Sequence, residues 1–340
     1  SFSVDRSGLL GITPPKKKNS TAPAVEKEPM TPLAKELVEL IGLKGPITIA
    51  EFMMQAANHS KHGYYHSKDT AKIGTEGDFV TSPEISQVFG ECIGVWCMST
   101  WEILGKPADF TLVELGAGNG TLLKDVLHVA GNFPDFHKAL KRVAVVERSQ
   151  DLRETQCSAL KGTEKVFKEE SLVSALSFQK TVARSINWYN LIDDIPEDKP
   201  IILLAQEFLD AFPVHQLVRN DDGVWSEKVI ALEEDDSSPY HFQTMLAPVA
   251  TPAVKVLTTD EPASDTNDIT TTIELCPGGL AAVQAVSRKL ASDKCTGAAL
   301  FIDYGENYTQ ADTLRGYRKH VQKNFLSDPG QTDVTADVDF

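Results

Sequence analysis

Three glycines in alternate positions stand directly after a short apolar segment of the chain. The segment comprises residues 111–115, and the glycines are Gly116, Gly118 and Gly120. Since glycine has no Cβ atom, such a loop can turn sharply and bring its backbone close to a bound ligand. The pattern indicates a cofactor loop at the end of a strand.

The spacing of these glycines and one neighbouring acid narrow the choice of cofactor. A dinucleotide fingerprint has the form G-x-G-x-x-G, whereas the third glycine here comes one position earlier. Glu114 stands two residues before the first glycine, where a carboxylate would repel a pyrophosphate but can balance the ammonium group of a methionine moiety. We therefore predict S-adenosyl-L-methionine as the cofactor, and a nicotinamide-dependent oxidoreductase is the disfavoured alternative.

A second acid follows the next apolar segment of the chain. Glu147 comes directly after residues 143–146, which are Val-Ala-Val-Val. An acid at the end of this strand can accept hydrogen bonds from both hydroxyls of a ribose. We interpret Glu147 as the second cofactor anchor.

Polar residues also follow the apolar segment at 201–205. Gln206, Glu207 and Asp210 come first, and His215 lies five residues further on. Two carboxylates can orient a cationic nucleophile such as a guanidinium and help to remove its proton during methyl transfer. The sequence therefore predicts Glu207 and Asp210 as catalytic residues, with His215 as a second candidate base, Gln206 beside the methyl donor, and no need for a metal.

Short apolar strands that alternate with helical stretches must position these residues. The strands are expected at 111–115, 143–146, 201–205 and 298–302. Continuous apolar strands are typical of a parallel sheet covered by helices on both faces, which binds ligands at the carboxyl ends of its strands. We expect a doubly wound, Rossmann-like α/β fold.

Helices are expected at 32–42, 47–57 and 83–104, the last with Val88, Cys92, Val95 and Trp96 on one face. The turn sequence Asn-Asp-Asp-Gly at 220–223 indicates a hairpin within an antiparallel insertion. The expected divisions are a flexible tail or presequence remnant (1–31), N-terminal helices with a cofactor loop (32–109), the methyltransferase core (110–215), a substrate-side β insertion (216–275) and a return to the core (276–340).

Composition excludes several other classes of protein. The 33 basic and 48 acidic residues give a net charge of −15, which disfavours nucleic acid and anionic membranes as partners. No apolar run approaches the ~20 residues that a membrane helix needs, so we expect no membrane insertion. The five cysteines are scattered and include no C-x-x-C pair, which indicates a reducing compartment and no structural zinc.

Four motifs, taken in order, give the chain a family resemblance. Residues 77–85 read Gly-Asp-Phe-Val-Thr-Ser-Pro-Glu-Ile, residues 113–120 hold the glycine loop, residues 206–214 begin Gln-Glu-Phe-Leu-Asp-Ala, and residues 301–305 read Phe-Ile-Asp-Tyr-Gly. Together they resemble the MidA-like methyltransferase family, which includes a mitochondrial complex I assembly factor that acts as a protein arginine methyltransferase. The resemblance covers the chain from about Pro32 to its end.

This resemblance implies a specific activity and location. It implies symmetric dimethylation of an arginine in a complex I core subunit, in the mitochondrial matrix, with S-adenosyl-L-methionine as donor. The alternative is a non-catalytic assembly chaperone whose bound cofactor is structural. The resemblance leaves the oligomeric state open.

Site residues can also be carried over from the family. Gly77, Asp78, Phe79 and Ser82 resemble its loop that closes over the cofactor, and Gln206 takes the place of an asparagine. The family's chains continue well beyond the point where this one stops, so we expect the final strands of the seven-stranded fold to be absent.

Overall fold

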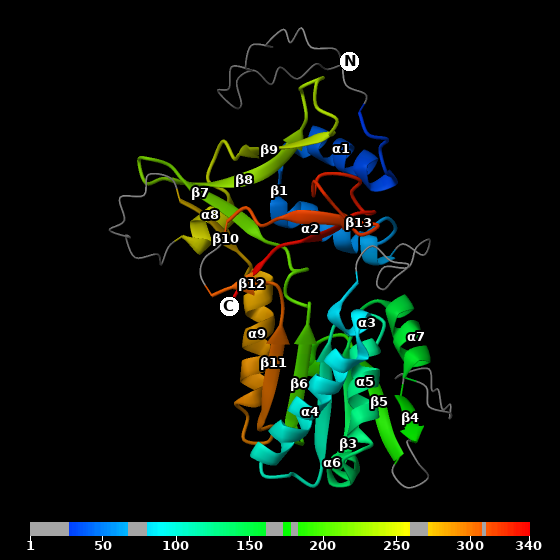
Figure 1. Cartoon of the computed structure of the whole chain (residues 1–340). Coiled ribbons are helices and arrows are strands. Elements are labelled where there is room, and N and C mark those ends of the chain that lie inside the picture. Colours follow the sequence, from blue (N-terminus) through cyan, green and yellow to red (C-terminus); the bar gives the residue numbers. More distant parts are fainter. Residues whose placement is uncertain (1–26, 67–79, 161–172, 178–182, 259–270, 308–310) are drawn as a thin grey trace.

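The computed structural model describes residues 27–66, 80–160, 173–177, 183–258, 271–307 and 311–340. These residues form two lobes, one built on a parallel sheet and the other on antiparallel strands (Figure 1). Most of the tail predicted at 1–31 lies outside the described residues, as do Gly77, Asp78 and Phe79 of the predicted cofactor-closing loop.

A six-stranded sheet in the order β11-β6-β2-β3-β5-β4 forms the centre of the first lobe within the described ranges. Its strands are β2 (Phe110–Leu115), β3 (Leu140–Val146), β4 (Val173–Ser177), β5 (Ala183–Tyr189), β6 (Ile201–Gln206) and β11 (Gly297–Ile302). All neighbouring pairs are parallel except β4 with β5. The predicted doubly wound α/β fold is confirmed.

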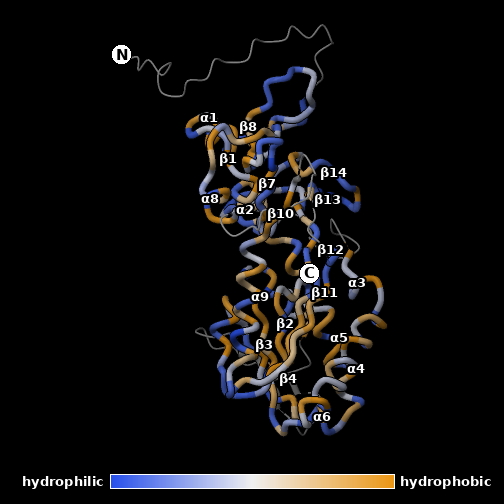
Figure 2. The backbone as a smooth tube through the Cα atoms, turned by 90° about the vertical axis from the view of Figure 1, so that its left-hand side faces the viewer, coloured by the Kyte–Doolittle hydropathy of each residue, from blue (hydrophilic) through white to orange (hydrophobic). Residues whose placement is uncertain are grey.

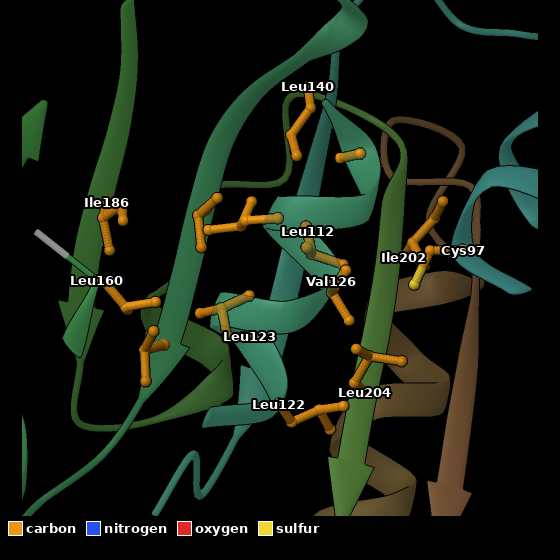
Figure 3. Packing of buried hydrophobic residues seen from close by; sticks show 14 of the residues in the cluster. Cys97, Leu112, Leu122, Leu123, Val126, Leu140, Leu160, Ile186, Ile202 and Leu204 are labelled. Atoms are coloured by element: carbon orange, nitrogen blue, oxygen red, sulfur yellow. The ribbon is translucent and has the colours of Figure 1, made fainter. Parts of the chain in front are cut away.

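Helices cover both faces of this sheet because alternate residues of each strand point to opposite sides. Leu112 and Ile202 pack against α5 on one face, while Val113 and Leu203 share a core with Val286 of α9 on the other. Seen from the side, α9 and the pair α4 and α5 flank the sheet (Figure 2), and Figure 3 shows the α5 face at close range. The helices and short turns of this lobe are α3 (Ser82–Ile85), α4 (Gln87–Ile103), α5 (Thr121–Ala130), α6 (Pro134–Ala139), α7 (Gln150–Ala159), η2 (Ile192–Asp194) and α9 (Pro277–Leu290).

The second lobe combines the N-terminal helices with the antiparallel insertion. Leu33 and Phe52 of the N-terminal helices are buried against Ile230 and Phe242 of the insertion. Strands β1, β8, β7 and β10 pair in that order, and β9 pairs with β8. The elements are α1 (Pro32–Lys44), β1 (Ile47–Thr48), α2 (Ile49–Asn58), η1 (Tyr64–His66), β7 (His215–Arg219), β8 (Trp225–Leu232), β9 (Phe242–Leu246), α8 (Pro252–Leu257) and β10 (Thr271–Leu275).

Within the segment 276–340, α9 and β11 lie in the parallel lobe and the rest leaves it. After β11 the chain crosses to the antiparallel lobe, where Leu326 and Val334 join the core around Phe52. The strands there are β12 (Gly305–Glu306), β13 (Arg315–Arg318), β14 (Val321–Lys323), β15 (Asp333–Thr335) and β16 (Val338–Asp339). This segment ends between the lobes (Figure 1), where the amide of Ala336 donates to the carbonyl of Asp210 at 3.1 Å.

The packed face of α4 differs from the one predicted. Val88 and Val95 are 62% and 45% exposed, while the buried positions include Gly90 and Gly94. A Cβ atom added to Gly90 would lie 2.5 Å from the Cβ atom of Asp125 in α5. The two helices therefore meet through glycines, which a hydrophobic pattern does not mark. Helix α1 also differs from its prediction, since its last residue is Lys44, two residues beyond the predicted end at 42, and Gly45 is its C-cap.

Three further observations concern membrane segments, metal sites and cysteines. None of the helices in the described ranges is long and apolar enough to cross a bilayer. The described residues contain no group of three or more His, Cys, Asp or Glu side chains placed to hold a metal ion. All five cysteines are free thiols, and three of them are buried.

Candidate active site

The glycine loop joins β2 to α5 at the carboxyl edge of the parallel sheet. Gly116, Gly118 and Gly120 have φ angles of +62°, +50° and +83°. These left-handed conformations cost other residues roughly 1–2 kcal/mol each, which explains why glycine stands at all three positions. The amide of Gly116 donates to the carbonyl of Val146 at 3.0 Å, so the loop turns back over the end of β3.

The glycine loop also touches the segment that follows β6. A Cβ atom on Gly116 would lie 2.8 Å from Cδ2 of Phe208, which is closer than real Cβ contacts. The missing side chain therefore lets the predicted cofactor loop and the predicted acceptor segment lie against one another. Strands β2 and β6 are neighbours in the sheet, which brings their two ends together.

Glu114 is a buried acid within β2. Glu114 is 3% exposed, and its Oε2 atom is buried without a hydrogen-bonding partner. Burial raises the pKa of Glu114 to about 8, because desolvation disfavours the charged carboxylate. An orphaned acid beside the glycine loop fits a cationic group such as the ammonium of a methionine moiety.

Glu147 lies directly after β3 in a well-connected position. Its Oε1 atom accepts the amide of Ser149 at 2.8 Å, and Oε2 accepts the side-chain amide of Gln156 at 3.3 Å. Burial raises the pKa of Glu147, while the hydrogen bonds from Ser149 and Gln156 oppose that shift. The acid predicted for the ribose therefore has a fixed orientation at the edge where the glycine loop turns.

Gln156 in α7 is a site residue that the sequence analysis missed. Its side-chain amide donates to the carbonyl of Gly118 at 2.9 Å as well as to Glu147. Its Oε1 atom accepts the indole N–H of Trp188 at 2.8 Å. Gln156 is fully buried and so ties the glycine loop to the ribose acid. No local pattern marks it, since the three partners come from separate segments.

The short helix α3 contacts both halves of the site. Glu84 Oε1 accepts the hydroxyl of Thr121 at 2.6 Å and the side-chain amide of Asn119 at 3.3 Å, both next to the last glycine of the loop. The amide of Ser82 donates to the carboxylate of Glu207. The structure thus brings Ser82 to Glu207, and its contact with the cofactor stays a prediction.

Glu207 follows β6 with an unusual backbone conformation. It has a φ of +48°, and its carboxylate accepts hydrogen bonds from the side chains of Gln206 and Tyr304. Burial raises its pKa, and the nearby charge of Asp303 acts in the same direction. Gln206 therefore lies against Glu207 at the end of β6.

Asp210 lies deeper, between the two lobes. Its Oδ2 atom accepts the hydroxyl of Thr335 at 2.9 Å. Burial raises the pKa of Asp210, and the charges of Asp303 and Asp333 raise it further. Within the described part of the chain, no ion pair involves Glu207, Asp210 or Asp303. This edge of the site therefore holds carboxylates that pair with no Lys, Arg or His of the described ranges.

His215 occupies a different environment from the other predicted catalytic residues. It begins β7 in the antiparallel sheet, and its Nδ1 atom lies 2.6 Å from Oε1 of Glu227. Glu227 is completely buried, and its Oε2 atom has no partner. The imidazole is thus engaged with Glu227 rather than with Glu207 or Asp210.

Comparisons with known proteins identify the family. A family model described as "Putative S-adenosyl-L-methionine-dependent methyltransferase" matches residues 92–340. The chain belongs to this family of S-adenosyl-L-methionine-dependent methyltransferases. The predicted enzyme class and cofactor are therefore confirmed.

Relatives and solved structures extend the comparison. Proteins named protein arginine methyltransferase NDUFAF7, mitochondrial, are 39% identical to this chain in Rattus norvegicus, over 99% of this chain and 74% of the relative, and 39% identical in Homo sapiens, over 92% and 68%. A protein from Burkholderia thailandensis, solved with bound S-adenosyl-homocysteine, has a TM-score of 0.66 and 25% identity over 91% of this chain and 73% of that one.

Proposed function

We propose that this protein transfers methyl groups from S-adenosyl-L-methionine to an arginine side chain of a protein substrate in mitochondria. The observation that carries the proposal is Glu207, an acid that pairs with no cation among the described residues and is held where the end of β6 meets the glycine loop of β2. The names of the relatives support arginine as the acceptor and mitochondria as the location. The finer proposal is symmetric dimethylation of a complex I core subunit in the matrix, in support of complex I assembly.

The cofactor would lie across the ends of β2 and β3. In this proposal Glu147 binds the ribose hydroxyls, the glycine loop receives the amino acid moiety, and Glu114 faces its ammonium group. The unpartnered Oε2 atom of Glu114 supports this fit, because a cationic partner would offset its desolvation. When bound, the cofactor supplies an electrophilic methyl group on a sulfonium.

Glu207 would bind and orient the acceptor. Its carboxylate already accepts hydrogen bonds from Ser82, Gln206 and Tyr304, so about one of its four lone-pair sites would remain to accept an N–H of the guanidinium and orient that group. The Glu207 carboxylate would accept the proton that the attacking nitrogen loses when it is methylated. The raised pKa of Glu207 suits it to accept this proton.

The other predicted catalytic residues would have supporting roles. Asp210 contributes negative charge from between the lobes, where Thr335 holds it. The role of base falls to Glu207 rather than to His215, since the imidazole of His215 is already paired with Glu227. Gly77, Asp78 and Phe79 remain proposed contacts of the cofactor.

The acceptor can be tested directly. The purified chain would be incubated with S-adenosyl-L-methionine carrying a CD3 methyl group and with a mitochondrial extract from cells that lack their own relative of this protein. We expect mass spectrometry to find the labelled methyl on arginine, with two labels on different terminal nitrogens of one residue. Label confined to lysine, a carboxyl group or RNA would refute the proposal.

The alternative of a non-catalytic chaperone predicts a different result in cells. Gly116→Val places a side chain where the ring of Phe208 lies and should abolish cofactor binding. If cells that express this variant still assembled complex I at the normal level, assembly would not require methyl transfer, and the chaperone alternative would be favoured. A failure to assemble with Glu207→Gln, which should keep its cofactor, at normal abundance supports the enzyme.

A further inference from the structure

A single side chain from β11 holds the turn that carries Glu207. Oδ2 of Asp303 accepts three consecutive backbone amides, from Phe208 at 3.1 Å, Leu209 at 2.8 Å and Asp210 at 3.3 Å. Its Oδ1 atom accepts the amide of Tyr304 at 3.0 Å. Asp303 is more than 90 residues away from this turn in the chain, so these contacts exist only in the folded protein.

The turn needs such support because its conformation is costly. Glu207 has a φ of +48°, a left-handed conformation that is strained for a residue other than glycine. Hydrogen bonds from amides to an ionised carboxylate are stronger than those between neutral groups, so the set formed by Asp303 can offset that strain. The amide of Glu207 is itself bonded to the carbonyl of Ile302 at 2.8 Å, next to Asp303.

We propose that Asp303 is a positioning residue for methyl transfer, which fixes the turn at 207–210 so that the Glu207 carboxylate faces the acceptor. The inference rests on the proposed function, in which Glu207 binds the acceptor. Asp303 also holds the amide of Tyr304, whose hydroxyl binds the carboxylate of Glu207. It thus constrains both the backbone and the carboxylate of Glu207.

Asp303 is poorly suited to bind the acceptor itself. Its Oδ2 atom accepts three amides and its Oδ1 atom accepts one, so Oδ2 has no lone pair left for a further donor. A guanidinium that bound both oxygens would have to displace the amides at Oδ2 and release the turn. Asp303 therefore acts through Glu207 rather than on the substrate.

The test combines two measurements on Asp303→Asn, Glu207→Gln and the double variant. The first is the initial rate at which labelled methyl groups reach arginine in the mitochondrial extract. We expect Asp303→Asn to lower this rate about tenfold or more in the otherwise unchanged chain, since misplacement by ~1 Å costs up to 100-fold. In the Glu207→Gln background the same change should have almost no further effect, because residues that act as a unit are not additive.

The second measurement does not depend on the substrate. Hydrogen exchange of the amides at 208–210 should become about tenfold faster or more in Asp303→Asn and stay unchanged in Glu207→Gln, since exchange reports local opening. Thermal unfolding and the affinity for S-adenosyl-homocysteine show whether the variant is folded and binds the cofactor. Asp235→Asn is the matched control, because Asp235 also accepts a backbone amide, that of Ser237 at 2.8 Å, in an exposed loop.

The outcomes separate this inference from the proposed function. Unchanged exchange at 208–210, a normal rate for Asp303→Asn, or two effects that multiply in the double variant would each overturn the positioning role. If the unaltered chain left arginine unlabelled, the proposed acceptor would be wrong, and the exchange measurement would still decide whether Asp303 holds the turn.

Discussion

Gly116 and Phe208 touch where the loop after β2 meets the segment after β6. The space for the ring of Phe208 exists only because Gly116 has no side chain, since a Cβ atom would lie 2.8 Å from Cδ2 of the ring. The contact joins the part of the site that faces the cofactor to the part that faces the acceptor. A change at Gly116 should therefore affect both.

We predict that Gly116→Ala weakens cofactor binding about tenfold or more and lowers the unfolding free energy by about 1–3 kcal/mol, because the φ of +62° becomes strained and Phe208 must move. Calorimetric titration with S-adenosyl-homocysteine and thermal unfolding would measure the two effects. Gly105→Ala is the control, since Gly105 has a φ of +84° with nothing within 4 Å of an added Cβ atom. It should lose stability but bind normally, and equal binding by both variants would contradict the assigned role of Gly116.

We predict that Gln156→Leu weakens cofactor binding and destabilises the protein. The change leaves the indole N–H of Trp188 without its acceptor and removes the hydrogen bonds to Gly118 and Glu147. Each buried polar group left unpaired lowers the unfolding free energy by about 1–3 kcal/mol. Gln150→Leu on the same helix is the control, because the amide of Gln150 reaches only Glu154 at an exposed position. Titration with S-adenosyl-homocysteine that gave one affinity for both variants would rule out a link through Gln156.

We predict that Glu114 makes the cofactor-free protein less stable as pH rises. Its pKa increases from its ordinary 4.5 to about 8 on folding, so between these values the unfolded chain releases a proton that the folded protein keeps. Stability associated with this group is therefore greatest below about pH 4.5 and is lost as pH rises to about 8.

Glu114→Gln should remove that dependence. The neutral amide has no proton to release, so the variant should melt at a higher temperature than the unaltered protein at pH 8. It should also bind S-adenosyl-homocysteine more weakly if the carboxylate meets the ammonium group. A variant that melts lower at pH 8 and binds more tightly would refute both assignments.

We predict that Gly90→Ala destabilises the contact of α4 with α5. Its Cβ atom would lie 2.5 Å from that of Asp125, and the overpacking cost of about 1–3 kcal/mol exceeds the gain in helix propensity of up to about 1 kcal/mol. Gly42→Ala is the control in α1, where nothing lies within 4 Å of an added Cβ atom. Urea unfolding should show this control to be more stable than the unaltered chain, and a gain in stability for both variants would contradict the packing described.

The sequence predicts the positions of the glycine loop, Glu147 and Glu207 because they follow apolar strands directly. In a parallel sheet the ends of neighbouring strands meet at one edge, so topology alone brings these residues together. The fold class follows from the same alternation of strands and helices.

Gln156, Glu84 and Asp303 could not be assigned their contacts in this way. Each one joins segments far apart in the chain, and the partners are often backbone groups that carry no residue identity. The predicted packed face of α4 was wrong for another reason, since the helix meets α5 through glycines such as Gly90. Its buried apolar residues are Cys97 and Trp101, which lie outside the predicted face. His215 lies on a strand of the second lobe, and the sequence does not reveal that its partner is Glu227.

The most direct test of the central claim is methyl transfer by Glu207→Gln at saturating cofactor. Labelled S-adenosyl-L-methionine and the mitochondrial extract would be used, with binding of S-adenosyl-homocysteine measured in parallel. We predict that the variant binds the cofactor analogue within about threefold of the unaltered chain but labels arginine at least about 100-fold more slowly, as expected for a group needed in the transition state. Normal labelling of arginine by this variant would show that the acceptor does not bind at the end of β6.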